Sequence, residues 1–149
     1  MKLSQYSNSL LIDLDLKAKN KEDVLNKLVE LLKKSGKVSD EEKVRNDLTQ
    51  REEIASTGLT YGIAIPHCRT TGVNGLVIGF ARSQKGVDFD ALDGGKSHLF
   101  FLIVAPVNLS SRVLGIVGYI SDKLRSKEER EKLYQAQFPQ EILNFLDDA

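Results

Sequence analysis

One histidine of the chain stands in a setting that suits chemistry. The stretch Tyr61–Thr70 (YGIAIPHCRT) places His67 directly after Pro66 and before Cys68 and Arg69. A neutral imidazole has a free ring nitrogen near pH 7, because its reference pKa is about 6.5, and it can attack phosphorus without a metal. Proline fixes its own φ and favours extended backbone in the residue before it. We therefore expect His67 on a stiff turn where a short apolar strand ends.

An arginine is the candidate for the positive charge that a phosphoryl group requires. A helix is expected to carry Val44 and Leu48 inward. At about 100° per residue, Arg51 lies within about 40° of the middle of that stripe and faces the protein. A guanidinium can hold two phosphoryl oxygens, and Arg51 is a better candidate than Arg69. These residues alone leave two interpretations of His67: a phosphorylatable nucleophile, or a histidine that is merely hydrogen-bonded in a turn.

Other chemistries fit the sequence poorly. Asp93–Ser97 (DGGKS) resembles the end of a phosphate-binding P-loop, but Asp90 stands where its first glycine belongs, and a strand follows instead of a helix. A structural zinc site needs about four ligands, which His67, His98 and Cys68 do not supply. Neighbours on an extended segment point to opposite sides, so Cys68 is interpreted as a packing residue and not as a thiol nucleophile paired with His67. His98 is interpreted as a half-exposed residue at a strand end.

Composition and length limit the classes of function. The 149 residues are expected to form one domain, residues 1–149, and the 21 basic and 21 acidic residues give no electrostatic footprint for nucleic acid or a membrane surface. The longest apolar run, Leu99–Val107, is too short to span a membrane, and Met1–Gln5 lacks the apolar core of a signal peptide. A single cysteine agrees with a reducing compartment. We expect a cytoplasmic protein whose partners are proteins or small molecules.

Alternating or continuous runs of apolar residues predict the strands. Leu10–Leu16 alternates apolar and acidic residues, as a half-buried strand does. Further strands are predicted at Ile63–Ile65, Leu76–Ala81 and Leu99–Ala105, and the last has the continuous apolar character of a strand buried on both faces. Glycine marks turns at Lys85-Gly86 and at Asp93–Gly95.

Helical periodicity predicts the remaining elements. The first helix follows Asn20 as N-cap and ends at Gly36, and the second begins near Asp40, where Ser39 and Glu42 have the spacing of a capping box. Three more helices are expected: from about Ser110 to Leu124, from Ser126 with Glu129 three residues on, and from Pro139. Strands interleaved with helices predict an α/β sheet that is covered on both faces.

Five segments of the chain resemble a known family, and they stand in the family's order. They are Arg51-Glu52, Thr57-Gly58, Gly62–His67 (GIAIPH), Gly86–Gly94 (GVDFDALDG) and Phe101–Pro106 (FLIVAP). They are similar to the enzyme IIA domains of the bacterial phosphotransferase system, of the fructose and mannitol type that also includes the nitrogen-regulatory relatives. The similarity spans nearly the whole chain, and GIAIPH is a far more specific signal than a lone histidine.

The resemblance implies both a fold and a reaction. The fold would be a mixed β-sheet with helices on both faces, of the phosphotransferase/anion transport protein-like kind. His67 would take a phosphoryl group from the histidine-containing phosphocarrier protein, Arg51 would stabilise its charge, and the Thr57 hydroxyl would bond the imidazole or the phosphoryl group. The acceptor would be enzyme IIB or, in the nitrogen branch, a regulated partner protein. No metal or bound cofactor is implied, and neither nucleic acid nor membrane insertion is expected.

Two positions depart from the family's pattern. Thr60 replaces a usual glycine or alanine in the loop before the strand. Family members often carry a second histidine at the start of the long helix after the Ala-Pro turn, but Val107–Val113 contains none. His98 does not replace it, because it lies on the other side of the strand, whereas Ser111 or Arg112 could fill the space.

Three functional hypotheses follow for this chain. The first is a free-standing IIA phosphocarrier that serves sugar uptake. The second is a regulatory protein whose phosphorylation state controls a transporter or kinase, which the missing second histidine favours. The third is a degenerate relative that keeps the fold without the chemistry.

Overall fold

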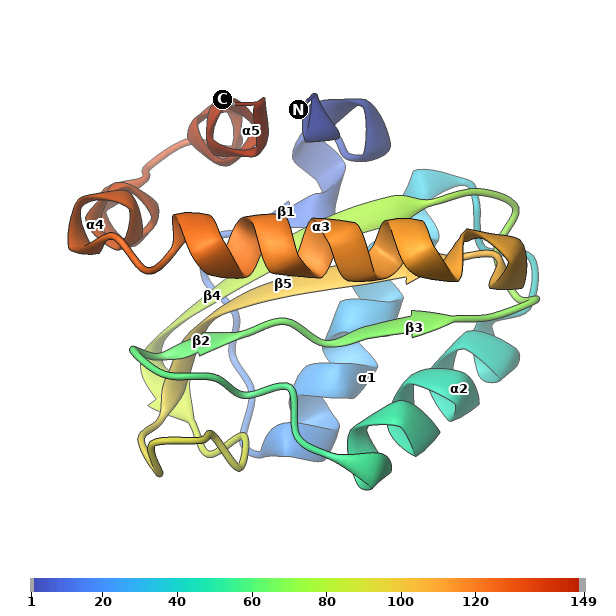
Figure 1. Ribbon diagram of the computed structural model, residues 1–149, viewed down its shortest axis with the longest axis horizontal. Helices are drawn as coiled ribbons and strands as arrows, with labels where there is room; N and C mark the ends of the chain where they lie inside the picture. Colours follow the sequence, from blue (N-terminus) through green and yellow to red (C-terminus); the bar gives the residue numbers. More distant parts are fainter. Residues whose placement is uncertain (1, 148–149) are drawn as a thin grey trace.

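A mixed β-sheet lies between two layers of helices in the computed structural model, which describes residues 2–147 (Figure 1). The strands are β1 (Ile12–Asp13), β2 (Ile63–Ala64), β3 (His67–Arg69), β4 (Val77–Val87) and β5 (Ser97–Ala105). The helices are α1 (Lys21–Leu32), α2 (Glu41–Ile54), α3 (Ser110–Lys123), α4 (Lys127–Gln135) and α5 (Pro139–Asp147). Short 3-10 turns are η1 (Leu3–Tyr6), η2 (Ser9–Leu11), η3 (Lys33–Ser35) and η4 (Val107–Leu109).

Strands β4 and β5 form the centre of the sheet. They pair antiparallel, and β1 pairs parallel with the outer side of β4. On the other side of β5, β2 and then β3 pair with it in parallel, so that His67 lies beside Ile103. The sheet is therefore mixed, as expected, and β3 lies along one of its edges.

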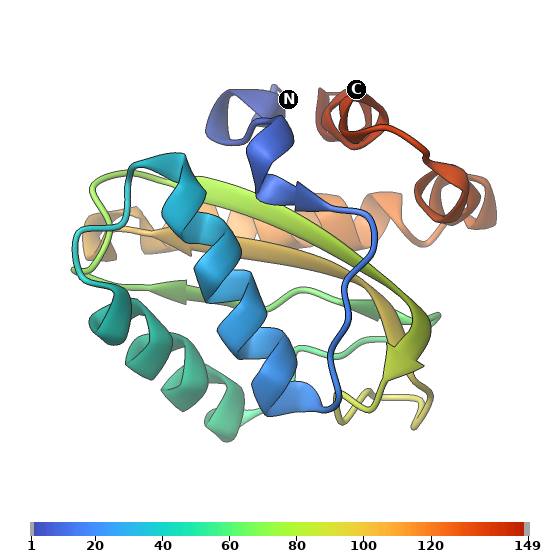
Figure 2. The ribbon, with the colours of Figure 1, turned by 180° about the vertical axis from the view of Figure 1, so that it is seen from behind.

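The alternation of side chains along β5 divides the core into two halves. Leu99, Phe101 and Ile103 pack with residues of α3, α4 and α5, whereas Phe100 and Leu102 pack with residues of α1 and α2. Successive residues of a strand point to opposite faces, so an uninterrupted apolar run serves both layers at once. Helix α3 crosses one face in Figure 1, and α1 and α2 cover the other face in Figure 2.

The first strand is shorter than the alternation predicts, because local polar groups interrupt it. The Asn8 side chain accepts the Leu10 N–H (2.8 Å) and opens the turn η2. The Asp13 carboxylate accepts the Asp15 N–H (2.9 Å) and ends β1. Such side-chain bonds compete with the strand ladder.

The prediction of a turn at Lys85-Gly86 is wrong. Strand β4 continues to Val87, and its register with β5 shifts between Arg82 and Val87. Gly86 has a φ of +78° and donates its N–H to the Ser83 hydroxyl (3.1 Å). The glycine therefore bends the strand without ending it.

The predicted helices are confirmed, apart from one cap. Asn20 caps α1, Gly36 follows its last turns with a φ of +74°, and Ser126 caps α4. Helix α2 begins where expected, but Asp40 is its N-cap and accepts the Lys43 N–H (3.1 Å). Ser39 instead donates its backbone N–H to Gly72. Among the helices of residues 2–147, none has both the length and the apolar character needed to cross a membrane.

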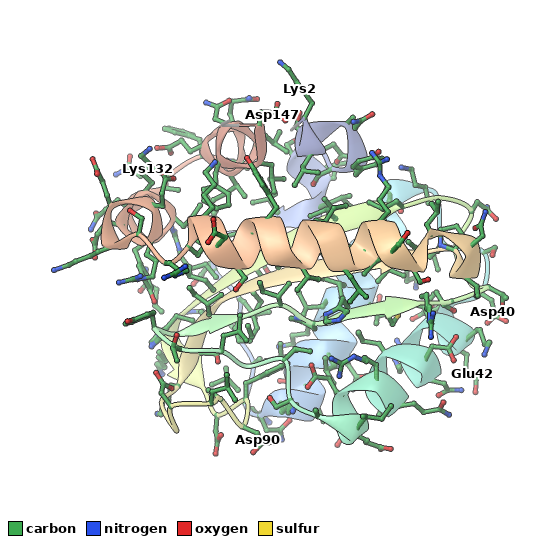
Figure 3. All side chains as sticks on the ribbon, viewed as in Figure 1. Lys2, Asp40, Glu42, Asp90, Lys132 and Asp147 are labelled. Atoms are coloured by element: carbon green, nitrogen blue, oxygen red, sulfur yellow. The ribbon has the colours of Figure 1, made fainter. Side chains whose placement is uncertain are left out.

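The cap of α2 yields a first prediction, because α2 carries Arg51. Replacement of Asp40, labelled at the start of α2 in Figure 3, removes the side-chain acceptor of that helix end. We expect Asp40→Ala to lower the free energy of unfolding by about 1 kcal/mol in urea titrations. Ser39→Ala is the matched control and should change it by less than about 0.5 kcal/mol. Equal losses in the two variants would contradict the assignment of the cap.

Candidate functional site

Strand β3 fixes the backbone on both sides of His67. The Pro66 carbonyl accepts the Ile103 N–H (3.1 Å), and Thr70 donates its N–H to the Ala105 carbonyl (2.9 Å). His67 therefore begins a strand and does not sit on a turn, because proline lacks an N–H but its carbonyl still pairs with β5. The rigid mount expected from Pro66 is provided by the sheet.

The His67 ring is oriented by one hydrogen bond. Its Nδ1 lies 2.7 Å from the Ile65 carbonyl oxygen. A carbonyl can only accept, so Nδ1 carries the proton and, in the neutral ring, Nε2 carries the free lone pair. Within residues 2–147, Nε2 has no hydrogen-bond partner. The nitrogen that is left free is thus a nucleophile of defined direction.

The surroundings keep this ring neutral. Burial lowers the pKa of His67 below 6.5, the backbone bond to Ile65 opposes that shift, the Arg51 charge lowers the pKa further, and Glu52 raises it. The imidazole is 9% exposed, which is enough for one face to reach a cavity. An imidazole that resists protonation keeps its lone pair at neutral pH.

A hollow of about 790 Å³ opens beside the ring at the β3 edge of the sheet. It lies between the second half of α2 and the start of α3. Its lining comes from three places: Asp47, Gln50, Arg51 and Ile54 of α2; His67, Cys68 and Arg69 of β3; and Val107, Ser110, Ser111, Val113 and Leu114 around the start of α3. The hollow is large enough for a phosphoryl group together with part of a protein partner.

Arg51 lies in this hollow with most of its hydrogen-bonding capacity available. Its Nη1 donates to the Ala55 carbonyl (2.9 Å), which holds the side chain at the end of α2. In the described part of the chain no carboxylate lies within 4.0 Å of its guanidinium, and Asp47, one turn earlier, pairs with Lys43 (2.9 Å). The guanidinium can therefore donate hydrogen bonds to the oxygens of a phosphoryl group in the hollow.

The Thr57 hydroxyl bonds a different group from the imidazole or phosphoryl group that the resemblance implies. The hydroxyl and the backbone N–H both donate to the carboxylate of Glu52, the N–H at 3.2 Å from each oxygen. Glu52 is a buried residue that the sequence analysis named within the Arg51-Glu52 segment but gave no role, although it follows Val44 and Leu48 at intervals of four on the inward face of α2. That spacing is the sequence signal that could have indicated an inward-facing Glu52.

The remaining candidates lie outside the reactive centre. Burial raises the pKa of Cys68 to about 12, so its thiol stays protonated, as expected of a packing residue. His98 bonds the Ser83 carbonyl through Nδ1 (3.0 Å) and is absent from the hollow. Of the two residues that could replace the second histidine, Ser111 lines the hollow, whereas Arg112 turns away to the Tyr6 hydroxyl.

The donor set of the site contains no metal cluster. In residues 2–147 no three side chains among histidine, cysteine, aspartate and glutamate lie close enough together to hold an ion. The polar groups that line the hollow are one imidazole, two guanidinium groups, the Gln50 amide, the Cys68 thiol, two serine hydroxyls and one carboxylate that is already paired. Such a set suits an anion.

Residues 5–149 match the family described as "Phosphoenolpyruvate-dependent sugar phosphotransferase system, EIIA 2". The chain belongs to this family. A fructose-specific EIIA component of Haloferax volcanii is 35% identical over 139 residues, which are 93% of this chain and 90% of that protein. A fructose-specific EIIABC component of Bacillus subtilis is 34% identical over 99% of this chain, which spans only 23% of that longer protein.

Solved EIIA structures share this fold. The nitrogen regulatory protein IIA-Ntr of Neisseria meningitidis has a TM-score of 0.89 at 29% identity, over 97% of this chain and 98% of that one. A complex of enzyme IIA mannitol and phosphorylated enzyme IIB mannitol of Escherichia coli has a TM-score of 0.76 at 26% identity, over 93% and 95% of the two chains. This EIIA chain is therefore similar to members of both branches.

The neutral ring gives a second prediction. Because the pKa of His67 is lowered on folding, the native protein binds this proton less tightly than the unfolded chain does. The contribution of His67 to stability is therefore present above pH 6.5 and is lost as the pH falls through the lower, native pKa. We expect an NMR titration of the native protein to give a His67 pKa below 6.5. The same spectra should show Nδ1–H as the tautomer of the neutral ring.

Two variants check the cause of this shift. Arg51→Gln removes a charge that lowers the pKa of His67 and should raise that pKa towards its ordinary value. Arg69→Gln removes a charge of the same sign from the exposed part of the hollow and should leave the pKa where it is. An unchanged pKa in Arg51→Gln would show that this guanidinium does not act on the ring.

Proposed function

We propose that this chain is a phosphohistidine carrier of the phosphotransferase system. His67 accepts a phosphoryl group on Nε2 from the histidine-containing phosphocarrier protein and passes it to enzyme IIB. The observation that carries the proposal is the hydrogen bond from Nδ1 to Ile65 (2.7 Å), which leaves the Nε2 lone pair free on a residue that lines a hollow together with Arg51. Membership of the EIIA family supports it.

The transfer needs no proton or cofactor in either direction. The Nε2 lone pair forms a bond to phosphorus while the nitrogen–phosphorus bond of the donor breaks, and its electron pair returns to the donor imidazole. The proton of His67 stays on Nδ1, bonded to Ile65, so that the phosphorylated ring carries positive charge. A cationic imidazole is a good leaving group, which makes the step reversible and onward transfer possible. Arg51 offsets the charge of the phosphoryl oxygens.

The rim of the hollow suits a protein partner. Ile54, Val107 and Leu114 are large apolar residues that line it and are exposed at 81%, 51% and 63%. Apolar side chains around a polar centre are typical of protein interfaces. Phosphorylation adds about −1.5 to −2 charges at neutral pH in the middle of this surface and changes its fit to a partner.

A regulatory role without sugar transfer is the second candidate. Two observations favour it: Ser110 and Ser111 line the site where many family members carry a second histidine, and the IIA-Ntr structure gives a higher TM-score than the mannitol complex. In this case the phosphorylated and unphosphorylated forms bind different partners, such as a transporter or kinase.

Phosphorylation of one residue is the direct test. Incubation with phosphoenolpyruvate, enzyme I and the phosphocarrier protein should add about 80 Da as an acid-labile label. His67→Ala should abolish the label, whereas His98→Ala and Cys68→Ala, which change the other histidine and the adjacent thiol, should keep it. Arg51→Ala should slow the transfer by about 100- to 1,000-fold, the loss typical of removing a group that stabilises developing charge. A full label in His67→Ala would falsify the assignment.

The acceptor decides between the two branches. If the chain serves sugar uptake, phosphorylated protein should lose its label to an enzyme IIB within seconds. If it is regulatory, the label should persist in the presence of IIB, and pull-downs with the phosphorylated and unphosphorylated forms should capture different proteins. Identical partners in both forms would remove the regulatory candidate.

A further inference from the structure

The carboxylate of Glu52 is buried behind the site and is fully engaged. Its side chain is only 3% exposed, and the Lys21 ammonium lies 2.9 Å from Oε2. The Thr57 N–H lies 3.2 Å from each of its oxygens, and the Thr57 hydroxyl also donates to it. Burying a charge is costly unless it is paired and hydrogen-bonded, so this arrangement needs an explanation.

Glu52 itself does not reach the phosphoryl position. It is absent from the lining of the hollow beside His67, and instead borders a separate polar cleft between α1 and α2. Lys21 stands at the first position of α1, against the Phe89 ring (4.7 Å). Any effect of this ion pair on the reaction must therefore pass through other residues.

Three hydrogen bonds in series connect Glu52 to the reactive ring. Glu52 accepts the Thr57 N–H, the Thr57 carbonyl accepts the Ile65 N–H (3.1 Å), and the Ile65 carbonyl accepts the His67 Nδ1–H (2.7 Å). Thr57 and Ile65 each use their N–H on one side and their carbonyl on the other. A displacement of Thr57 would therefore move the oxygen that sets the direction of the imidazole.

We infer that Glu52, held in place by Lys21, is a positioning residue for phosphoryl transfer by His67. The inference rests on the proposed function of His67. The Glu52 side chain fixes Thr57 by accepting its N–H, Thr57 fixes Ile65, and Ile65 selects the Nδ1–H tautomer, which leaves Nε2 free. Because Glu52 follows Arg51 on α2, the same anchor also holds the end of the helix that presents the guanidinium.

Electrostatics agrees with this geometry. Two adjacent residues of α2 act on the imidazole in opposite directions: Arg51 lowers the pKa of His67 and Glu52 raises it. The other charged groups around the hollow are Asp47 on α2 and Arg69 on β3. Glu52 thus supports the basicity of the nucleophile from behind, without occupying the space that the phosphoryl group needs.

A pair of double variants isolates the link to Thr57. Lys21→Met/Glu52→Gln and Lys21→Met/Glu52→Leu both remove the two charges together, so that neither leaves a buried ion unpaired, and glutamine and leucine are similar in size. Glutamine keeps an acceptor for Thr57, whereas leucine does not. We expect the glutamine variant to accept phosphoryl groups within about threefold of the wild-type rate, and the leucine variant to be slower by about 10- to 100-fold at saturating phosphocarrier protein.

The control and the readouts separate positioning from folding. Asp90→Asn removes the other carboxylate near Lys21 (3.4 Å), which is 74% exposed and does not bond Thr57, and should transfer at the wild-type rate. Figure 3 labels Asp90 at the lower edge of the molecule, in the loop between β4 and β5. In the unphosphorylated proteins, ¹⁵N shifts of the His67 ring should report the Nδ1–H tautomer in the wild type, the glutamine variant and Asp90→Asn, and a mixture of tautomers in the leucine variant.

These results also distinguish failure of the inference from failure of the proposed function. Equal rates and equal tautomers in the two double variants would overturn the positioning role, whereas absence of phosphorylation in the wild type would overturn the function and leave the tautomer test intact. Glu52→Asp is a second variant in case the leucine protein does not fold. It keeps the charge beside Lys21 but is one methylene shorter, and it should show the same slower transfer and mixed tautomers. A wild-type rate in Glu52→Asp would contradict the inference.

Discussion

The hydrogen bond between the Ile65 carbonyl and His67 Nδ1 is the interaction on which the site depends. It fixes the tautomer, and the tautomer decides which nitrogen is nucleophilic. The bond forms because Pro66 separates the two residues and allows the chain to pair with β5 on both sides of the imidazole. Strand β5 therefore holds the backbone on both sides of His67, and through it the imidazole ring.

Charge around this ring is arranged so that an anion can arrive without competition. Arg51 bonds only a backbone carbonyl in residues 2–147, Asp47 is paired with Lys43, and Glu52 is turned away to Lys21 and Thr57. Asp47 and Glu52 already have partners, so the guanidinium stays available to an incoming anion. This separation also explains how α2 can carry acidic residues beside the proposed phosphoryl site.

The start of α3 lacks the second histidine that the resemblance to the family leads one to expect. Serines 110 and 111 line the hollow, and Arg112 leaves it for Tyr6. Serine hydroxyls can donate hydrogen bonds to phosphoryl oxygens, but they do not titrate near pH 7 and cannot act as a histidine would. Under the proposed function, the phosphoryl group would be held by neutral donors and Arg51, an arrangement that is compatible with both transfer and regulation.

The sequence by itself determined most of the helices and strands and singled out His67 as the candidate nucleophile, because periodicity, caps and the GIAIPH segment are local patterns. It predicted the α/β sheet, the five helices, and His67 and Arg51 as candidate site residues. Only the tertiary structure decided that His67 begins a strand, that Thr57 bonds Glu52, and that Ser111 lines the hollow while Arg112 does not. These outcomes depend on which distant groups meet, such as Lys21 with Glu52 and Pro66 with Ile103, and contacts between residues far apart in the chain leave no periodic trace in the sequence.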